Sequence, residues 1–175
     1  MKIEPLQTER FLVKSLTVED VSEQYVSWFS EKTVRQYIVA ARFRQTLETL
    51  RTFVAEKLAS ETALLLGIFS KTEGGHIGNM KFEPIDRAAG RAVVGILIGE
   101  TDWRGRAVFG EVFAAAVRIL AETMQVTHFW LGVEKENESA IRAYCKAGFR
   151  VEAPPHDLFP ESHPDGLTMH CQILS

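Results

Sequence analysis

The order of apolar segments in the middle of the chain is the feature that most constrains its fold. Segments at residues 63–69, 76–85 and 92–99 are separated by short turn sequences, which predicts three strands in an antiparallel meander. Good helix formers then fill residues 108–124, and another apolar segment follows at 128–134. Because a strand–helix–strand connection within one sheet is nearly always a right-handed parallel crossover, we expect a mixed sheet.

Apolar periodicity predicts further elements on both sides of this block. They are strands at residues 10–16, 149–151 and 167–174, and helices that begin near Thr17, Thr46 and Asn137. No linker, repeat or low-complexity stretch interrupts the chain, so we expect one domain over residues 1–175. The predicted fold class is α/β (an α+β mixed sheet). It has a mostly antiparallel sheet of about six to seven strands, one parallel crossover pair and helices on both faces.

Composition and charge exclude several classes of protein. The formal net charge of -3 gives no general attraction for nucleic acids or anionic membranes. No apolar run approaches the roughly 20 residues needed to cross a bilayer. Glu4 and Pro5 interrupt the region where a signal peptide would be apolar, so we expect a cytoplasmic protein. Cys145 and Cys171 lack the spacing of a zinc site, so we expect reduced thiols and no bound metal.

The first motif with chemical meaning lies between a buried strand and the long predicted helix, where residues 103–111 read WRGRAVFGE. Small residues allow backbone N–H groups to approach an anion, and a helix N-terminus adds unpaired donors and partial positive charge. Arg104 and Arg106 add full charges that pair with phosphate oxygens. The segment therefore predicts a diphosphate site. The alternative is a glycine-containing turn with solvated arginines.

The second motif covers residues 133–149, where a strand is followed by Asn137, a helix and the pair Gly148-Phe149. Asn137 is a good helix N-cap, but its side-chain amide could equally bind the amide groups of a ligand. Tyr144 follows two helical turns later and therefore projects from nearly the same face. For Tyr144, the alternative is a half-buried aromatic residue with a packing role only.

These motifs resemble those of the GNAT superfamily of acetyl-CoA-dependent N-acetyltransferases. RGRAVFG (104–110) is similar to the family's pyrophosphate loop, and NESAIRAYCKAGF (137–149) is similar to its next signature. HIGNMK (76–81) is similar to the third strand of the Rim-type branch, named after ribosomal-protein N-terminal acetyltransferases. The resemblance extends from about residue 10 to residue 174. It implies acetyl-CoA as co-substrate and an amine as acceptor.

The resemblance also implies which residues contact acetyl-CoA. They would be Ile98, Gly99, Arg104, Gly105, Arg106, Ala107, Val108, Phe109, Gly110, Asn137 and Ser139. Two of them depart from the family pattern. Ala107 stands where glycine is usual, which costs little if its φ stays negative. Phe109 stands where a small residue is usual, and its benzyl group could block the phosphate or point into the core.

In this family the amine attacks the thioester directly in a ternary complex. By resemblance, the backbone N–H groups of Ile98 and Gly99 would stabilise the developing oxyanion, and Tyr144 would protonate the leaving thiolate. For the base that takes the amine proton, Glu83 is preferred and Glu100 is the alternative, although either carboxylate could be a solvated surface group. His76 titrates in the right range but is expected to be exposed.

The acceptor is less constrained by the sequence. An amino sugar or aminoglycoside, a polyamine, and a protein N-terminus all fit the resemblance, and we favour a small soluble amine because no acidic run could receive a basic protein tail. Aromatic residues of the first helical segments could stack on a sugar or simply fill the core. They are Trp28, Phe29, Tyr37 and Phe43. A homodimer is possible, and the alternative function is a non-catalytic acyl-CoA-binding or regulatory module.

The same reasoning predicts how the carrier arm would bind. The strands at 92–99 and 128–134 are expected to separate at their C-terminal ends, because an acetyl-pantetheine arm between them could pair with unpaired strand groups.

Overall fold

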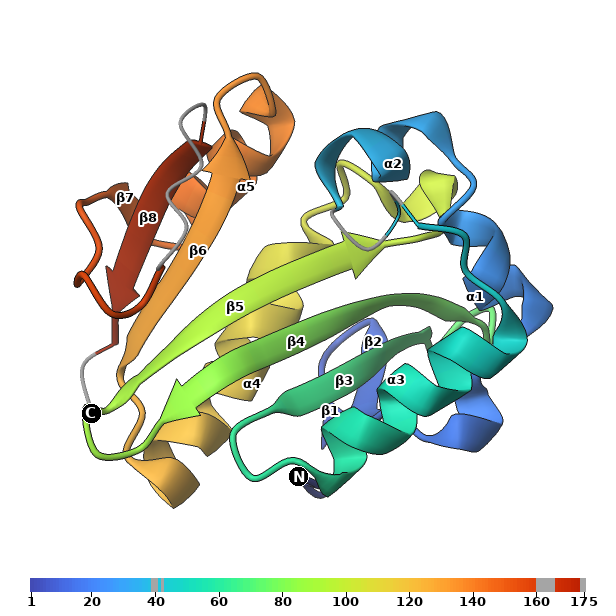
Figure 1. The fold of residues 1–175 in the computed structure, drawn as a ribbon, viewed down its shortest axis with the longest axis horizontal. Helices are drawn as coiled ribbons and strands as arrows, with labels where there is room; N and C mark the ends of the chain where they lie inside the picture. The colour runs from blue at the N-terminus through green and yellow to red at the C-terminus, as the bar shows by residue number, and fades with distance from the viewer. Residues whose placement is uncertain (39–40, 42, 160–165, 174–175) are drawn as a thin grey trace. The chain divides into compact units, whose positions relative to one another are not determined.

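The computed structural model describes residues 1–38, 41, 43–159 and 166–173. These residues form one mixed sheet of eight strands in the order β1-β2-β3-β4-β5-β6-β8-β7 (Figure 1). The strands are β1 (Leu6–Gln7), β2 (Phe11–Ser15), β3 (Leu64–Ser70), β4 (His76–Asp86), β5 (Arg91–Ile98), β6 (His128–Glu134), β7 (Arg150–Val151) and β8 (Gly166–Gln172). The helices are α1 (Glu23–Trp28), α2 (Lys32–Tyr37), α3 (Leu47–Ala59), α4 (Val108–Met124) and α5 (Glu138–Lys146), with 3-10 turns η1 (Val18–Asp20) and η3 (Thr101–Trp103).

This architecture confirms the predicted fold class. β5 and β6 form the expected parallel pair, and the long helix α4 connects them. The sheet has one strand more than expected, because β1 pairs with β2 through Leu6 with Val13 and Gln7 with Leu12. A strand of two residues is too short to produce a periodic sequence pattern.

The chain forms two compact units. The first comprises Met1–Lys81 and Ile96–Arg104, and the second comprises Phe82–Gly95 and Gly105–Ser175. Strands β4 and β5 therefore contribute residues to both units. The expectation of a single domain stays a prediction.

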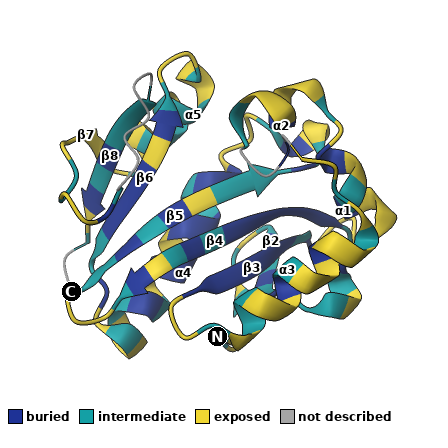
Figure 2. Ribbon diagram, in the orientation of Figure 1, coloured by how far each residue is buried: buried dark blue, intermediate teal, exposed yellow. Residues whose placement is uncertain are grey.

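In the first unit, a buried cluster joins α1, α3 and β3. β3 is buried along most of its length, whereas α3 turns an exposed face outward (Figure 2). The buried members are Leu16, Val21, Tyr25, Trp28, Phe29, Val34, Ala41, Leu50, Val54 and Leu65. Thr46 is the N-cap of α3, as predicted, and its Oγ1 accepts the Thr49 N–H at 3.2 Å.

The first helix begins later than the sequence predicted. Asp20 Oδ2 accepts the Thr17 N–H at 2.9 Å in the predicted capping box, but this box caps only the short turn η1. Val21 is extended, with φ -77° and ψ 111°, and so interrupts the helical path. α1 then starts after Ser22, whose Oγ accepts the Tyr25 N–H at 3.2 Å.

In the second unit, aromatic side chains from a helix and two strands meet in the core. Phe113 of α4 lies with its ring centroid 5.5 Å from Phe129 of β6 and 5.1 Å from Phe149. Phe82 of β4 contacts Phe129 edge-on, at 5.9 Å. Gly148 has φ +94°, the left-handed conformation expected of a glycine that ends a helix such as α5.

The parallel register between β5 and β6 is short. It joins Arg91, Ala92 and Val93 to His128, Phe129 and Trp130. Both strands continue, β5 to Ile98 and β6 to Glu134, and just beyond the register Gly95 and Gly132 are exposed. The register described within the second unit therefore covers the first part of each strand. The predicted separation of their C-terminal ends stays a prediction.

Three observations bear on expectations drawn from composition. Cys145 is exposed and Cys171 is buried, and both are free thiols, as expected. Across the described residues, no group of three or more His, Cys, Asp or Glu side chains could hold a metal ion. In the same part of the chain, no helix has both the length and the apolar composition of a membrane span.

Candidate active site

The predicted diphosphate loop of the second unit presents backbone donors at the start of α4. Gly105 has φ +72° and Ala107 has φ +57°, and Ala107 is the helix N-cap without a side-chain cap bond. The first N–H groups of a helix have no acceptor within the helix, and its dipole adds partial positive charge there. A Cβ built at Gly105 or Gly110 would meet no atom within 4 Å, so an anion can approach the backbone closely. These residues fit the diphosphate of acetyl-CoA.

The left-handed Ala107 does not meet the condition under which alanine was expected to cost little at this position. Alanine would cost little here only at a negative φ, and a non-glycine residue in the left-handed region costs about 1–2 kcal/mol. The preceding Gly105 is also left-handed, and alternating turn conformations of this kind aim successive N–H groups toward one anion. The strain at Ala107 is therefore consistent with a loop shaped for binding rather than for stability.

Phe109 points into the core of the second unit and not toward the loop. Its side chain is only 6% exposed and stacks on Phe113, with ring centroids 5.2 Å apart. The edge of the adjacent Tyr144 ring meets it at 4.7 Å and 73°. The steric objection to phosphate binding is thereby removed, because the benzyl group supports Tyr144 instead.

Tyr144 lies on α5, half-buried between Phe109 and Phe149, whose ring centroids are 4.7 and 6.1 Å away. Burial raises the pKa of the Tyr144 hydroxyl to about 12, because the phenolate would lose hydration. The hydroxyl therefore stays protonated over the whole working pH range of an ordinary enzyme. A protonated hydroxyl on a fixed ring is a suitable proton donor.

Asn137 and Ser139 are engaged in capping α5. The Asn137 Oδ1 accepts the Ala140 N–H at 3.2 Å and the Ser139 hydroxyl at 3.3 Å. The helix-cap interpretation of Asn137 is therefore confirmed. A role of either side chain in binding a ligand stays a prediction.

In the first unit, the end of β5 contains a local irregularity. The N–H groups of Gly99 and Glu100 both donate to the Ile77 carbonyl, at 3.0 and 3.2 Å, which is the pattern of a β-bulge. The Gly99 N–H is therefore already bonded and does not fit the predicted role of oxyanion donor. Neighbouring N–H groups of a strand point to opposite edges, so the Ile98 N–H points away from β4.

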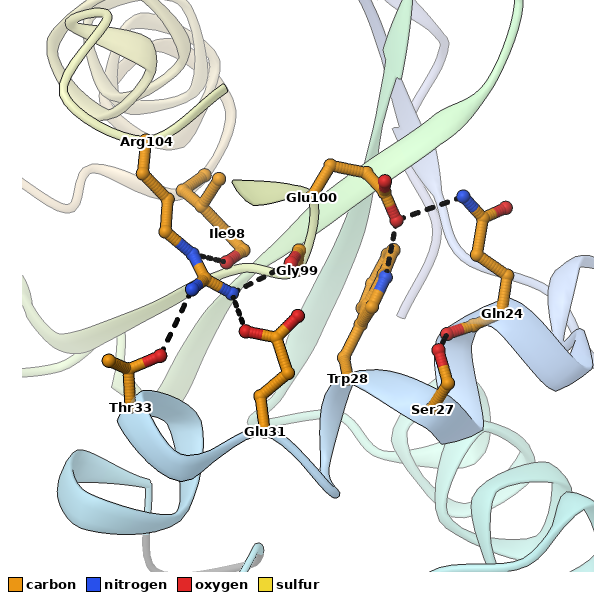
Figure 3. Close-up of polar contacts among 9 residues, drawn as sticks. All are labelled: Gln24, Ser27, Trp28, Glu31, Thr33, Ile98, Gly99, Glu100 and Arg104. Carbon is orange, nitrogen blue, oxygen red and sulfur yellow. Dashed lines mark hydrogen bonds and ion pairs between the residues drawn. The ribbon is translucent and has the colours of Figure 1, made fainter. Parts of the chain in front are cut away.

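Trp28 explains why residue 99 is glycine. A Cβ at Gly99 would lie 1.9 Å from Cδ2 of the Trp28 indole, which packs directly on the strand backbone. The Trp28 Nε1 donates to Glu100 Oε1 at 2.7 Å, and Gln24 Nε2 donates to the same oxygen at 2.9 Å (Figure 3). Glu100 is thus a half-buried carboxylate with a fixed orientation at the strand end.

Arg104 lies on the other side of this strand end, and its guanidinium is bonded to protein groups. Nε donates to the Ile98 carbonyl at 3.0 Å and one terminal nitrogen donates to the Gly99 carbonyl at 2.7 Å (Figure 3). The guanidinium also donates to Thr33 Oγ1 at 3.0 Å and pairs with Glu31 at 2.8 Å. This network does not fit the expected phosphate contact of Arg104. Arg106, in contrast, is exposed in the second unit.

His76 is buried, contrary to expectation. It is 8% exposed, and its ring stacks on Phe69 with centroids 4.8 Å apart and lies 4.8 Å from Trp28. Its Nε2 is 2.8 Å from Asn79 Oδ1 and 3.0 Å from the Gly78 carbonyl, so Nε2 carries the proton. Burial lowers the His76 pKa and favours the neutral ring. The position was misjudged because His76 starts a hairpin arm, where side chains are often exposed.

Two other groups of predicted residues are placed as follows. Glu83 is half-buried in β4 and, by strand alternation, points to the opposite face from Phe82, which packs on Phe129. Trp28 and Phe29 are 2% and 8% exposed and so belong to the core, not to a sugar platform. Of the other aromatic residues, Tyr37 is half-buried and Phe43 is 70% exposed.

Sequence reasoning missed the partners that hold the strand end. They are Gln24, Glu31, Thr33 and Asn79. Their types are common on surfaces. Gln24, Glu31 and Thr33 bond to residues far along the chain, so no local pattern identifies them, whereas Asn79 bonds to the nearby His76.

The sequence was also compared with models of known protein families. Residues 10–150 match the model of the acetyltransferase (GNAT) domain. The chain belongs to the GNAT family. The matched residues include the α4 loop and all of α5, so the family inferred from RGRAVFG and the Asn137–Phe149 signature is confirmed. A comparison with curated proteins gave no match.

Solved structures share the fold of this GNAT domain at low sequence identity. RimL, a ribosomal-protein α-N-acetyltransferase bound to coenzyme A, is 14% identical with a TM-score of 0.82, over 97% of this chain and 98% of that one. The microcin immunity acetyltransferase MccE, bound to acetyl-CoA and AMP, is 16% identical with a TM-score of 0.78, over 94% and 93%. A chimera of spermidine N-acetyltransferase SpeG from Vibrio cholerae is 14% identical with a TM-score of 0.74, over 93% and 95%. These similarities show a fold shared with a Rim-type enzyme.

Proposed function

We propose that this GNAT protein transfers an acetyl group from acetyl-CoA to a primary amine. The observation that carries the proposal is the start of α4, where left-handed Gly105 and Ala107 precede a helix N-terminus that has no side-chain cap. A diphosphate is the ligand that such a loop suits best. RimL and MccE, which have the same fold, hold coenzyme A and acetyl-CoA.

The residues of the chain would share the chemistry as follows. Bound acetyl-CoA would supply a thioester carbonyl that the neutral amine attacks in a ternary complex. The Ile98 N–H, which points away from β4, would donate to the carbonyl oxygen as negative charge develops. The Tyr144 hydroxyl, kept protonated by burial, would give its proton to the leaving thiolate.

The amine must lose a proton before it can attack. Glu83 is the proposed base, because it is a half-buried carboxylate that points away from the core aromatic residues of its strand. Glu100 is the alternative, since its orientation is fixed by Trp28 and Gln24 at the end of β5. We propose that the acceptor is a small amine, such as a polyamine or an amino sugar, rather than a protein N-terminus, and that the protein works in the cytoplasm.

A panel of acceptors tests this proposal. Purified protein would be mixed with acetyl-CoA and a thiol-detecting reagent in the presence of polyamines, amino sugars, aminoglycosides and N-terminal peptides. We expect amine-dependent release of free thiol with at least one small amine, and acetyl-CoA binding in calorimetry. Binding without any turnover across the panel would instead support the alternative, a non-catalytic acyl-CoA-binding module. The core position of Phe109 weakens that alternative, because it removes the steric reason for lost cofactor chemistry.

A further inference from the structure

Arg104 follows a short turn that is fixed to the core of the first unit. Trp103, the last residue of η3, is 7% exposed and meets Phe11 edge-on, with ring centroids 5.2 Å apart. Its Nε1 also donates to Glu73 Oε2 at 3.2 Å. The Arg104 N–H donates to the Thr101 carbonyl at 3.0 Å and closes the turn. The Arg104 backbone is therefore fixed, and its side chain returns over the end of β5 (Figure 3).

The guanidinium joins two segments that lie far apart in the sequence. Toward the strand, it holds the carbonyls of Ile98 and Gly99. Toward the helices, it holds the Thr33 hydroxyl in α2 and the Glu31 carboxylate at the N-cap of α2 (Figure 3). A planar guanidinium has donors in fixed directions, so four such contacts restrict both segments at once.

The contact with the Ile98 carbonyl has a specific consequence for the proposed chemistry. In an antiparallel strand, the N–H and C=O of one residue point to the same edge. The Ile98 carbonyl that accepts from Arg104 Nε and the Ile98 N–H proposed as oxyanion donor therefore project from the same edge of β5. By holding the Ile98 and Gly99 carbonyls, Arg104 fixes the two peptide planes that follow the donor residue and so restricts the backbone of Ile98 itself.

The charge of Arg104 is also compensated. Glu31 lies 2.8 Å away, and both side chains are about one-third exposed, at 30% and 35%. At this distance, the negative charge of Glu31 cancels most of the electric field of Arg104 beyond the ion pair itself. Arg104 is therefore poorly suited to attract phosphate, although its place in the sequence motif predicted that role.

We infer that Arg104 is a positioning residue, which aligns the Ile98 oxyanion donor with the start of α2 and does not bind the diphosphate. This inference rests on the proposed acetyl transfer and assigns a different role to the first arginine of RGRAVFG. It predicts that Arg104 variants lose turnover while they retain affinity for acetyl-CoA.

The experiment compares Arg104→Lys with Arg104→Gln. Lysine keeps the charge but loses the planar fork, whereas glutamine loses the charge as well. Calorimetry would give the Kd for acetyl-CoA, and steady-state kinetics with the best acceptor of the panel would give kcat and the acceptor KM. We expect both variants to keep the Kd within about twofold, and both to lose roughly tenfold to a hundredfold in kcat, the range for a misplaced reacting group.

If Arg104 instead bound the diphosphate, its variants would lose affinity for acetyl-CoA rather than kcat. The inference is overturned if Arg104→Gln weakens acetyl-CoA binding tenfold or more and Arg104→Lys restores it. It is equally overturned if both variants keep the wild-type kcat and KM. A wild-type protein that binds acetyl-CoA but acetylates no amine would count against the proposed function itself, independently of any Arg104 variant.

Two further variants separate positioning from general loss of structure. Glu31→Gln removes the ion pair at the α2 end and should reproduce part of the loss in kcat with the Kd unchanged. Arg118→Lys is the matched control, because Arg118 is an exposed residue of α4 outside this network, and it should behave as wild type. Unfolding midpoints of all variants would be measured, and a loss of kcat at an unchanged midpoint supports the inference.

Discussion

Arg104 and Arg106 are two residues apart, but they belong to different compact units and differ in exposure. Arg104 belongs to the strand end of the first unit, where four protein groups hold its guanidinium. Arg106 belongs to the loop of the second unit, where it is exposed beside left-handed Gly105 and Ala107. The contacts of Arg104 show that the place of a charged residue in a binding motif does not by itself assign its role.

The two regions also use different kinds of donor. The strand end is built from side chains that bond to one another, as with Glu100, Trp28 and Gln24. The loop is built from backbone N–H groups at the start of α4. Side-chain networks define a geometry, whereas backbone donors at a helix N-terminus bind an anion. We therefore expect variants of the strand end to affect turnover and variants of the loop to affect cofactor affinity. Tyr144 and Glu83, which lie outside the loop in the second unit, are expected to affect turnover.

The largest effect is expected from Tyr144→Phe. This change removes the proposed proton donor but keeps the ring that packs on Phe109, so the fold should be retained. General acid catalysis contributes about 10²–10⁴ in rate, and we expect a loss of that size in the chemical step with little change in the Kd for acetyl-CoA. Single-turnover kinetics would measure it. The loss should be smaller for an acyl donor with a less basic thiolate, and a wild-type rate would leave Tyr144 with a packing role only.

The raised pKa of Tyr144 also determines how its contributions to activity and to folding stability depend on pH. With a folded-state pKa of about 12, the donor stays protonated well above pH 9, so it causes no alkaline loss of activity in the usual range. The ordinary pKa of tyrosine, near 10, is lower than this folded-state value. The contribution of Tyr144 to folding stability is therefore complete below pH 10 and is lost as the pH rises toward 12. An alkaline loss below pH 9 that disappears in Tyr144→Phe would contradict this assignment.

The next effect distinguishes the two candidate bases. Glu83→Gln should lower kcat/KM for the amine by about 10², because a general base is lost. Glu100→Gln keeps an oxygen that can accept from Trp28 Nε1, so we expect a smaller loss of about tenfold. If Glu100→Gln causes the larger loss of kcat/KM and Glu83→Gln the smaller, the base belongs to the strand end of the first unit.

A smaller effect is expected from Arg106→Ala. Loss of a charge-assisted hydrogen bond to phosphate should weaken acetyl-CoA binding by about 1–3 kcal/mol, with kcat at saturation nearly unchanged. Titration calorimetry at two salt concentrations would test it, since the difference from wild type should decrease as salt screens the charge. Arg104→Gln is the comparison, and an equal loss of affinity in both variants would remove the distinction between the two arginines.

Local signals in the sequence predicted more of the fold than of the site. The Thr46 cap, the Gly148 helix end and the parallel crossover depend on neighbouring residues or on chain order, and all are present. The contacts of Arg104 were not predicted, because its Thr33 partner lies 71 residues away. The role predicted for the Gly99 N–H failed for the same reason, because the accepting carbonyl belongs to Ile77 on another strand. Composition and spacing do not contain such contacts.

The smallest effect concerns the strained residue of the loop. Ala107→Gly should relieve a left-handed conformation that costs about 1–2 kcal/mol, while the added freedom of glycine in the unfolded chain returns part of that gain. We expect the free energy of unfolding to rise by up to about 1 kcal/mol, as measured by urea denaturation. Ala114→Gly, at an exposed position inside α4, is the matched control and should lose about 1 kcal/mol. Affinity for acetyl-CoA should be retained in Ala107→Gly, because glycine adopts the same backbone conformation. If both substitutions destabilise the protein equally, the loop is not strained at Ala107, and its backbone geometry would no longer support an anion-binding role.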